Sequence, residues 1–417
     1  MNFLRRFWHA AAKVFDLPRR LRGLGDRRCD PAIPPSVLFT TLFLGALLRV
    51  PSFLQLQQET TRRGIQRLLA WSGRLSDDAL AYGAEHADLP ALRGLLVAVN
   101  RTLKQNKALE AAKINGLLVV AIDANEQFSS RARCCPECSQ RQIKIATQMG
   151  QVVEVTEYYH RHVYAQLHGP HLSLVLDLEA IRPGEDECAA ALRLLGRMRR
   201  LYGPRFFDAI TVDAWYTKGP FLRAVQKLGW GVVAVLKQER FEVYQETTAL
   251  TQPQAPQRWQ WEDRAVDLWE VKDLSFTEVR GPVRVVVAEE NWLEVKQVGG
   301  KRRRQAQHAS WRWLATEELD PCAAQVVWRI GHQRWGVENH AFNELTQYYH
   351  LEHCPHHEPV AIVAWLLILV LGLVLFEWFA RLQGKLWRQG NVTLRELAKA
   401  LDRAAERWEE LEPLWSG

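Results

Sequence analysis

Two short apolar segments that end in aspartate constrain the fold of this chain more than any other feature. Residues 116–123 read Gly-Leu-Leu-Val-Val-Ala-Ile-Asp, and residues 206–213 read Phe-Phe-Asp-Ala-Ile-Thr-Val-Asp. Short runs rich in β-branched residues are typical of strands that are buried on both faces. An aspartate at the carboxyl end of such a strand lies where open α/β sheets hold their reactive groups. The pattern predicts an α/β fold with Asp123 and Asp213 as candidate site residues.

A third carboxylate comes from residues 327–352, which predict one long helix with a polar centre. Arg334 and Glu338 are four residues apart, so they share a helix face. An ordinary ion pair on a solvated face is the simpler interpretation. The two upstream aspartates favour another one, because three converging carboxylates bind hard divalent cations and Mg²⁺ pairs assist phosphoryl displacement.

The run RWGVENHAFNELTQYYHLEH, residues 334–353, resembles the glutamate signature of the DDE transposases of bacterial insertion sequences. That signature places Arg four residues before Glu and is often followed by Phe-Asn-Glu-Leu. Asp123 and the Asp213-Ala-Trp-Tyr run match its first two acidic positions, and the resemblance covers roughly residues 110–380. The chain departs from the family pattern at Gly331, where Tyr is frequent, and at Leu345, where Lys is frequent.

The resemblance implies a transposase that cleaves DNA and transfers strands at insertion-sequence ends. Asp123, Asp213 and Glu338 would hold Mg²⁺ or Mn²⁺, and Arg334 would orient Glu338 or hold a phosphate. The implied partners are terminal inverted repeats, target DNA and a second copy of the chain, in the bacterial cytoplasm at the nucleoid. Three alternatives stay open: a ribonuclease-H-like nuclease without strand transfer, a non-catalytic DNA-binding protein, and an inactive transposase copy.

The predicted elements between residues 111 and 236 run in the order three strands, helix, strand, helix, strand. This is the order of a ribonuclease-H-like core, and it brings the strands of Asp123 and Asp213 side by side. Four other acidic residues compete for the second carboxylate position: Asp177, Glu179, Glu185 and Glu187. We interpret them as residues of a strand edge and of the first turn of a helix, where the helix dipole stabilises negative charge.

Patterning divides the rest of the chain into further segments. Residues 1–110 predict an all-helical N-terminal domain that binds DNA or only packs. Residues 237–321 predict a β-rich insertion, which by resemblance would position the transposon end. Residues 322–385 would complete the catalytic core, and residues 386–417 would form a C-terminal helix.

Basic residues mark two candidate DNA contacts in a chain of net charge +7. Residues 1–28 carry seven arginines and read as a basic amphipathic arm. Lys301, Arg302, Arg303 and Arg304, with Trp311 and Trp313 nearby, fit backbone contact and base stacking. The alternative for both is a solvated basic segment.

Seven scattered cysteines argue against a disulfide framework and for a reducing compartment. Cys135 and Cys138 have the spacing of half a zinc knuckle, and the missing half could come from the histidine-rich residues 350–357. Free thiols are the other interpretation and the one we favour from sequence, because a second paired motif is absent.

Residues 360–376 are uncharged and mostly apolar, at the lower length limit of a membrane span. A buried helix that covers the sheet fits better beside segments typical of water-soluble domains. We therefore expect no membrane association.

Overall fold

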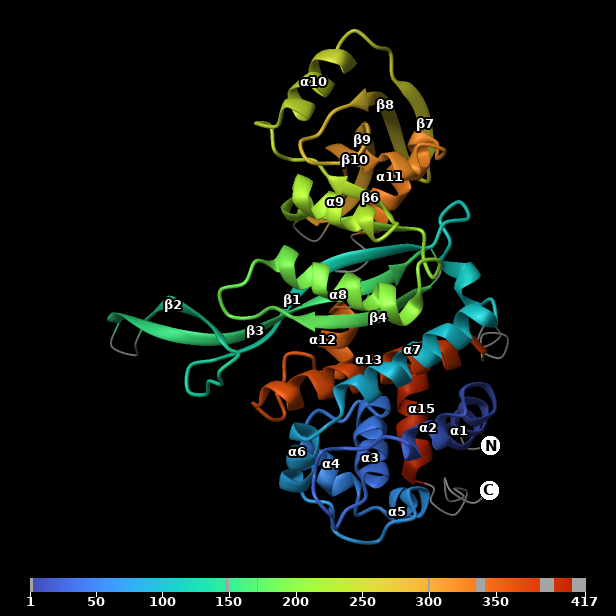
Figure 1. The fold of residues 1–417 in the computed structure, drawn as a ribbon, viewed down its shortest axis with the longest axis vertical. Helices are drawn as coiled ribbons and strands as arrows, with labels where there is room; N and C mark the ends of the chain where they lie inside the picture. Colours follow the sequence, from blue (N-terminus) through green and yellow to red (C-terminus); the bar gives the residue numbers. More distant parts are fainter. Residues whose placement is uncertain are drawn as a thin grey trace.

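The computed structural model has an α/β fold with a helical N-terminal region, as predicted from the sequence (Figure 1). The helices gather at one end of an elongated molecule, a mixed sheet crosses its middle, and a β-rich region forms the other end. The structure describes residues 3–146, 150–170, 172–298, 301–334, 342–382 and 394–406.

The N-terminal helices begin at capping residues that the sequence marks. The Ser76 side chain accepts a hydrogen bond from the amide of Ala79, and Asp88 accepts one from Ala91. The elements are α1 (Phe3–Phe15), α2 (Leu17–Arg22), α3 (Pro35–Leu47), α4 (Phe53–Glu59), α5 (Arg63–Leu69), α6 (Asp77–Glu85), α7 (Leu89–Gln105) and the 3₁₀ helix η1 (Ala108–Ala112).

The expected basic arm is a packed helix along most of its length. Helix α1 buries Leu4, Phe7 and Phe15, and the Phe7 ring packs edge-on against Phe379 at 5.4 Å. Its two arginines, Arg5 and Arg6, lie between Leu4 and Phe7 in the sequence, and the buried apolar residues share one face of the helix. The apolar stripe decides the packing, and the charges are left on the outside.

One mixed sheet links the middle of the molecule to its β-rich end. The strand order is β2-β3-β1-β5-β6-β10-β9-β8-β7, and β4 pairs with β3. Strand β1 is antiparallel to β3 and parallel to β5, and β5 is parallel to β6. The strands are β1 (Val119–Ser130), β2 (Ser139–Ala146), β3 (Val152–His168), β4 (Ser173–Ala180), β5 (Ala209–Val212), β6 (Gly231–Val235), β7 (Gln257–Trp261), β8 (Arg264–Leu274), β9 (Val283–Val298) and β10 (Lys301–Thr316).

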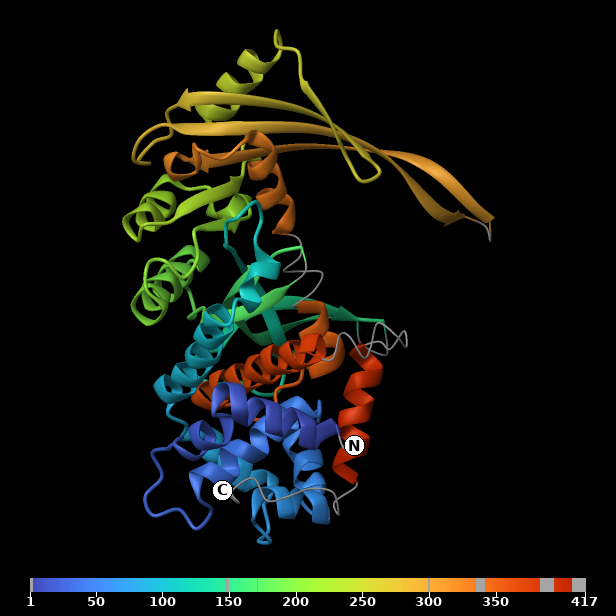
Figure 2. The same ribbon diagram turned by 90° about the vertical axis from the view of Figure 1, so that its right-hand side faces the viewer.

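Residues 237–321 extend the central sheet, because β10 pairs with β6 in antiparallel fashion. Helix α10 (Glu242–Thr251) precedes four strands here, and η3 (Glu317–Leu319) follows them. Figure 2 shows the β9–β10 hairpin reaching well beyond the body of the molecule. Helix α8 (Glu187–Tyr202) leads from β4 into β5, and helix α9 (Gly219–Lys227) connects the parallel strands β5 and β6.

The predicted single helix over residues 327–352 is wrong at both ends. Helix α11 (Ala324–Gln333) begins earlier, and α12 (Asn343–Tyr349) ends at His350, whose φ of 55° is left-handed. Residues 335–341, which include Gly336 and Glu338, lie outside the described residues.

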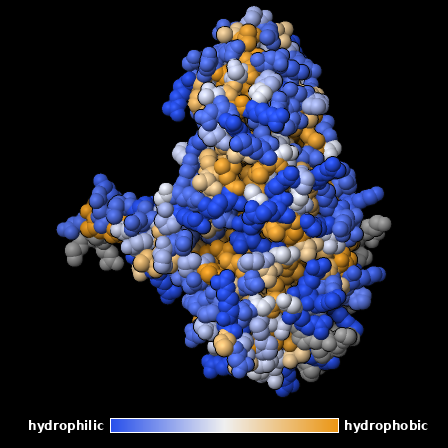
Figure 3. All heavy atoms as spheres, viewed as in Figure 1, coloured by the Kyte–Doolittle hydropathy of each residue, from blue (hydrophilic) through white to orange (hydrophobic). Residues whose placement is uncertain are grey.

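Helix α13 (Pro359–Leu382) contains the apolar run and is a core helix. Among the described residues it is the one helix long and apolar enough to cross a membrane, and 83% of its most apolar window is buried inside the protein. It packs against α3, α6, α7 and β4. Figure 3 shows hydrophilic side chains over most of the β-rich end and the protruding β2–β3 hairpin. Helix α15 (Leu394–Glu406) packs on α1 and α5.

Candidate active site

The prediction that a strand ends at Asp123 is wrong, because β1 continues to Ser130. Asp123 lies on β1 just beyond the part of that strand that pairs with β5, and Asp213 directly follows β5. The register pairs Val119 with Ala209 and Ala121 with Thr211. Each aspartate comes two residues after the last of these pairs, so both side chains leave the sheet on the same face. The two carboxylates therefore lie at the same level of adjacent strands, at the edge where α/β sheets bind ligands.

Two carboxylates hold the loop that follows Asp213: that of Asp213 itself and that of Asp186 at the start of helix α8. Asp213 accepts a hydrogen bond from the amide of Trp215 at 2.8 Å. Asp186, which caps α8, accepts from Trp215 Nε1 at 3.2 Å and from Lys218 Nζ at 3.0 Å. These contacts orient Asp213 and leave the Trp215 ring 58% exposed beside it.

Asp123 is paired with Arg334, for which the resemblance implies a role in orienting Glu338 or holding a phosphate. Arg334 Nη1 donates to Asp123 Oδ2 at 3.3 Å, and both side chains are largely buried. Tyr216 lies close by: burial, and then the charges of Glu187 and Asp123, raise the pKa of its hydroxyl. Glu338, the third predicted ligand, lies outside the described residues.

Helix α11 reaches Asp123 because the β-rich region anchors it. Glu290 is fully buried, and its Oε1 accepts a hydrogen bond from Trp328 Nε1 at 2.8 Å. His332 Nε2 lies 2.5 Å from the same oxygen. Burial alone raises the pKa of Glu290, but hydrogen bonds and charge, chiefly from His332, lower it below its ordinary value. The buried carboxylate is therefore ionised and bonded, as such groups must be.

Gly331 explains one departure from the transposase pattern. A Cβ atom at this position would lie 2.2 Å from Trp313 Nε1, so the helix backbone packs directly against the indole ring. Tyrosine, which is frequent in the family at this position, has no room here. Trp313 is 2% exposed and belongs to the core, so the prediction that it stacks on DNA bases is wrong.

The four rival carboxylates are all engaged in ion pairs with arginines. Asp177 is buried and bonded to Arg197 at 2.8 Å and Arg93 at 3.3 Å. This network ties β4 to helices α7 and α8, which agrees with a structural interpretation. The remaining pairs are Glu179 with Arg193 and Arg197, Glu185 with Arg193, and Glu187 with Arg161.

Cys135 and Cys138 lie in a second cluster with two histidines. His357, from the predicted histidine-rich segment, is one of them. The other is His160, which the sequence analysis missed. Strand pairing places His160 opposite Phe128, shortly before the cysteine loop, and no local pattern in the sequence indicates this pairing.

The basic residues 301–304 begin β10 at the tip of the β9–β10 hairpin (Figure 2). Arg302, Arg303 and Arg304 are exposed, and Arg304 pairs in register with Val295. The tip lies on the protruding arm, away from the edge that holds Asp123 and Asp213.

Comparisons with known proteins identify the family. A family model described as the transposase DDE domain matches residues 158–375, which are 218 of the 417 residues and include Asp213, Arg334 and Glu338 but not Asp123. Among solved structures, the cryo-EM structure of a piggyBac transposase synaptic complex with hairpin DNA is similar over 97% of this chain and 79% of its own, with 12% identity and a TM-score of 0.40. The comparison with curated proteins found no match. The chain belongs to the transposase DDE domain family.

Proposed function

We propose that this DDE transposase carries out metal-dependent DNA cleavage and strand transfer at the ends of an insertion sequence. The observation that carries the proposal is the placement of Asp123 and Asp213 on the adjacent parallel strands β1 and β5, each two residues beyond the last paired residue. Arg334, directly after α11, is bonded to Asp123. A ribonuclease-H-like core is part of the proposal. The strand order β4-β3-β1-β5-β6 supports it, with the first three strands antiparallel and the last three parallel.

The edge of the sheet that carries Asp123 and Asp213, here called the acidic edge, fits a hard divalent cation such as Mg²⁺ or Mn²⁺. Carboxylate oxygens are the donors such ions prefer, and Asp123 and Asp213 are both partly accessible. Together with Glu338 they would hold the metal, which when bound polarises a phosphate and activates water or a 3′ hydroxyl.

The chain's own residues preorganise this edge. The Trp215 amide fixes the Asp213 carboxylate, so little reorganisation is needed when a cation binds. Arg334 holds Asp123 in place, and its guanidinium also supplies positive charge next to a bound phosphate. The Glu290 network keeps α11, and therefore Arg334, at this edge.

Terminal repeats and target DNA are the proposed partners. Exposed arginines on the β9–β10 tip, together with Arg5 on α1, favour a phosphate backbone. We further propose a homodimer on DNA, action at the bacterial nucleoid, and functional segments at residues 1–110, 111–236, 237–321, 322–385 and 386–417.

The decisive experiment uses linear DNA that carries the ends flanking the gene. Wild type, Asp213→Asn, Glu338→Ala and the control Asp267→Asn on β8 are incubated with this DNA in Mg²⁺ and in EDTA. Cutting at the ends by wild type and the control only in Mg²⁺, with no cutting by the other two variants, supports the proposal. Loss of a group that merely orients a metal ligand costs roughly 10–100-fold, so loss of a ligand should exceed that.

A second assay offers pre-cut ends with a free 3′ hydroxyl and a target plasmid. Joined product supports strand transfer, whereas cutting without joining indicates a nuclease. Normal cleavage by Asp213→Asn would refute the assignment of the acidic edge.

A further inference from the structure

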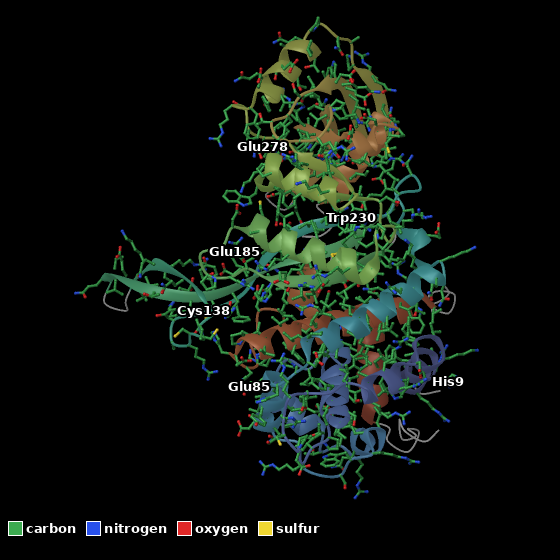
Figure 4. The ribbon with its side chains drawn as sticks, viewed as in Figure 1. His9, Glu85, Cys138, Glu185, Trp230 and Glu278 are labelled. Carbon is green, nitrogen blue, oxygen red and sulfur yellow. The ribbon has the colours of Figure 1, made fainter. Side chains whose placement is uncertain are left out.

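Four metal-binding side chains from separate parts of the chain converge beside the base of the β2–β3 hairpin. Cys135 and Cys138 lie in the loop between β1 and β2, His160 on β3, and His357 just before α13. Their ligand atoms all lie within 4.8 Å of one another. In Figure 4, Cys138 lies at the base of this hairpin, close to the segment that leads into α13.

The distances within this cysteine–histidine cluster fit one small ion at its centre. The two sulfur atoms are 3.6 Å apart, too far for the roughly 2.05 Å bond of a disulfide. Cys138 Sγ lies 3.2 Å from His160 Nε2 and 3.1 Å from His357 Nε2. A tetrahedral zinc ion with bonds of about 2.3 Å to sulfur and about 2.0 Å to nitrogen separates two sulfurs by roughly 3.8 Å and a sulfur from a nitrogen by roughly 3.5 Å. The sulfur pair is close to the first value, and the sulfur–nitrogen contacts are a few tenths of an ångström shorter than the second.

We propose that Cys135, Cys138, His160 and His357 bind a single zinc ion in a closed structural site. Two thiolates and two imidazoles form a donor set that zinc favours, and four protein ligands leave no position for substrate. An iron–sulfur cluster is the other metal centre that two cysteines and two histidines can form. In such a cluster two irons are present, and the histidines and cysteines bind different irons. Cys135 Sγ lies only 3.3 Å from His160 Nε2, so the cluster has room for one ion.

The surroundings of the cluster are built to hold these ligands. The Cys135 amide donates to Cys138 Sγ at 3.2 Å, and the Cys138 amide donates to the Cys135 carbonyl at 3.1 Å, which closes a tight turn. The Phe128 ring packs 5.3 Å from His160 and 5.8 Å from His357 and shields one side. The thiol of Cys354 donates instead to the carbonyl of His356, so it is not a fifth ligand.

The ion would fasten together elements that are distant in sequence. Cys138 and His357 are 219 residues apart. His357 belongs to a stretch between α12 and α13 without regular secondary structure, so backbone hydrogen bonding alone does little to fix it. The zinc therefore clamps the start of α13 to strands β1 and β3, and β1 also carries Asp123.

The test measures metal content and does not depend on DNA cleavage. The full chain is purified without chelator and its zinc is quantified by mass spectrometry, for wild type, Cys135→Ser, His357→Ala and the matched controls Cys134→Ser and Cys354→Ser. We expect about one zinc per chain in wild type and both controls, and less than about one tenth in the two cluster variants.

Variants that fail to fold are covered by a measurement on wild type alone. X-ray absorption at the zinc edge should give two sulfur and two nitrogen neighbours, and Co²⁺ substitution should give the intense visible bands of a tetrahedral site. Wild type without zinc that also fails to bind added Zn²⁺ or Co²⁺ overturns the proposal. Equal loss of zinc from Cys354→Ser and Cys135→Ser, or a shell of oxygen neighbours, overturns it as well.

Discussion

The acidic edge and the cysteine–histidine cluster share strand β1, yet they differ in chemistry. On β1 and β3, Asp123 pairs in register with Tyr164, and Phe128 beside the cluster pairs with His160. The edge presents hard oxygen donors that are partly open to solvent, whereas the cluster presents soft donors that close on themselves. A site that must exchange water, DNA and metal needs open positions, and a site that only holds the fold does not.

The largest expected contrast is the response to chelation. EDTA should abolish cleavage, because carboxylate-bound Mg²⁺ exchanges readily, and added Mg²⁺ should restore it in full. Brief EDTA treatment should leave the zinc content and Tm unchanged, since four protein ligands hold that ion. Cleavage assays and differential scanning calorimetry on the same sample check this; parallel loss of activity and Tm would mean that the two centres are not separate.

Substitution should separate the two centres in the same way. Asp213→Asn should leave Tm unchanged or slightly higher, because it removes repulsion between two neighbouring carboxylates. Cys138→Ser should lower Tm by several degrees, at about 2–4 °C for each kcal/mol lost. Thermal unfolding of both variants, with Cys134→Ser as the control, measures the difference. A lower Tm in Asp213→Asn than in Cys138→Ser would reverse our assignment of roles.

Arg334→Lys tests how much the edge depends on a planar guanidinium. Lysine keeps the charge but loses the fixed geometry of the donor toward Asp123, and we expect cleavage to fall roughly tenfold. DNA affinity, measured by fluorescence anisotropy, and zinc content should not change. Arg101→Lys on α7, whose guanidinium bonds a backbone carbonyl, is the control. Unchanged cleavage by Arg334→Lys would remove this residue from the site.

Gly331→Ala tests whether packing of α11 on Trp313 supports the edge. The added methyl has no room beside the indole ring, and overpacking typically costs about 1–3 kcal/mol. The matched control is Gly94→Ala in helix α7, where a Cβ meets nothing within 4 Å and helix propensity should stabilise by about 1 kcal/mol. Urea unfolding compares them, and equal stability of the two variants would show that the close approach to Trp313 is unimportant.

The smallest expected effect is the pH dependence of the Glu290 network. The pKa of Glu290 is below its ordinary value, so its ionised form stabilises the folded protein above about pH 4.5. That stabilisation is lost as the pH falls through the lowered pKa. The stability difference between wild type and Glu290→Gln should therefore shrink from pH 7 to pH 4 in urea unfolding. A difference that stays constant over this range would contradict the argument.

Local sequence patterns predicted the elements of the fold that depend on a few neighbouring residues. Apolar runs marked β5 and β6, whose residues are all buried. The predicted order of elements also placed β1 beside β5. These succeed because periodicity acts over a few residues.

Long-range packing accounts for the failures. The pairing of β10 with β6 joins the predicted insertion to the central sheet, and no pattern within either segment indicates this pairing. Trp313 looked available for DNA but fills the space beside Gly331. A tryptophan reads the same in sequence whether its partner is a base or a glycine, so only the fold distinguishes the two.

The sequence by itself determined which residues carry carboxylates, thiols and imidazoles, and it placed Asp123 and Asp213 after two apolar runs that form strands. Tertiary structure decided which of them meet. Arg334 lies against Asp123 although 211 residues separate them, and His357 lies against Cys138 across 219. Metal and phosphate chemistry depends on separations of a few ångströms, whereas the sequence specifies positions along a chain. Folding converts one into the other through strand pairing and core packing that no single segment contains.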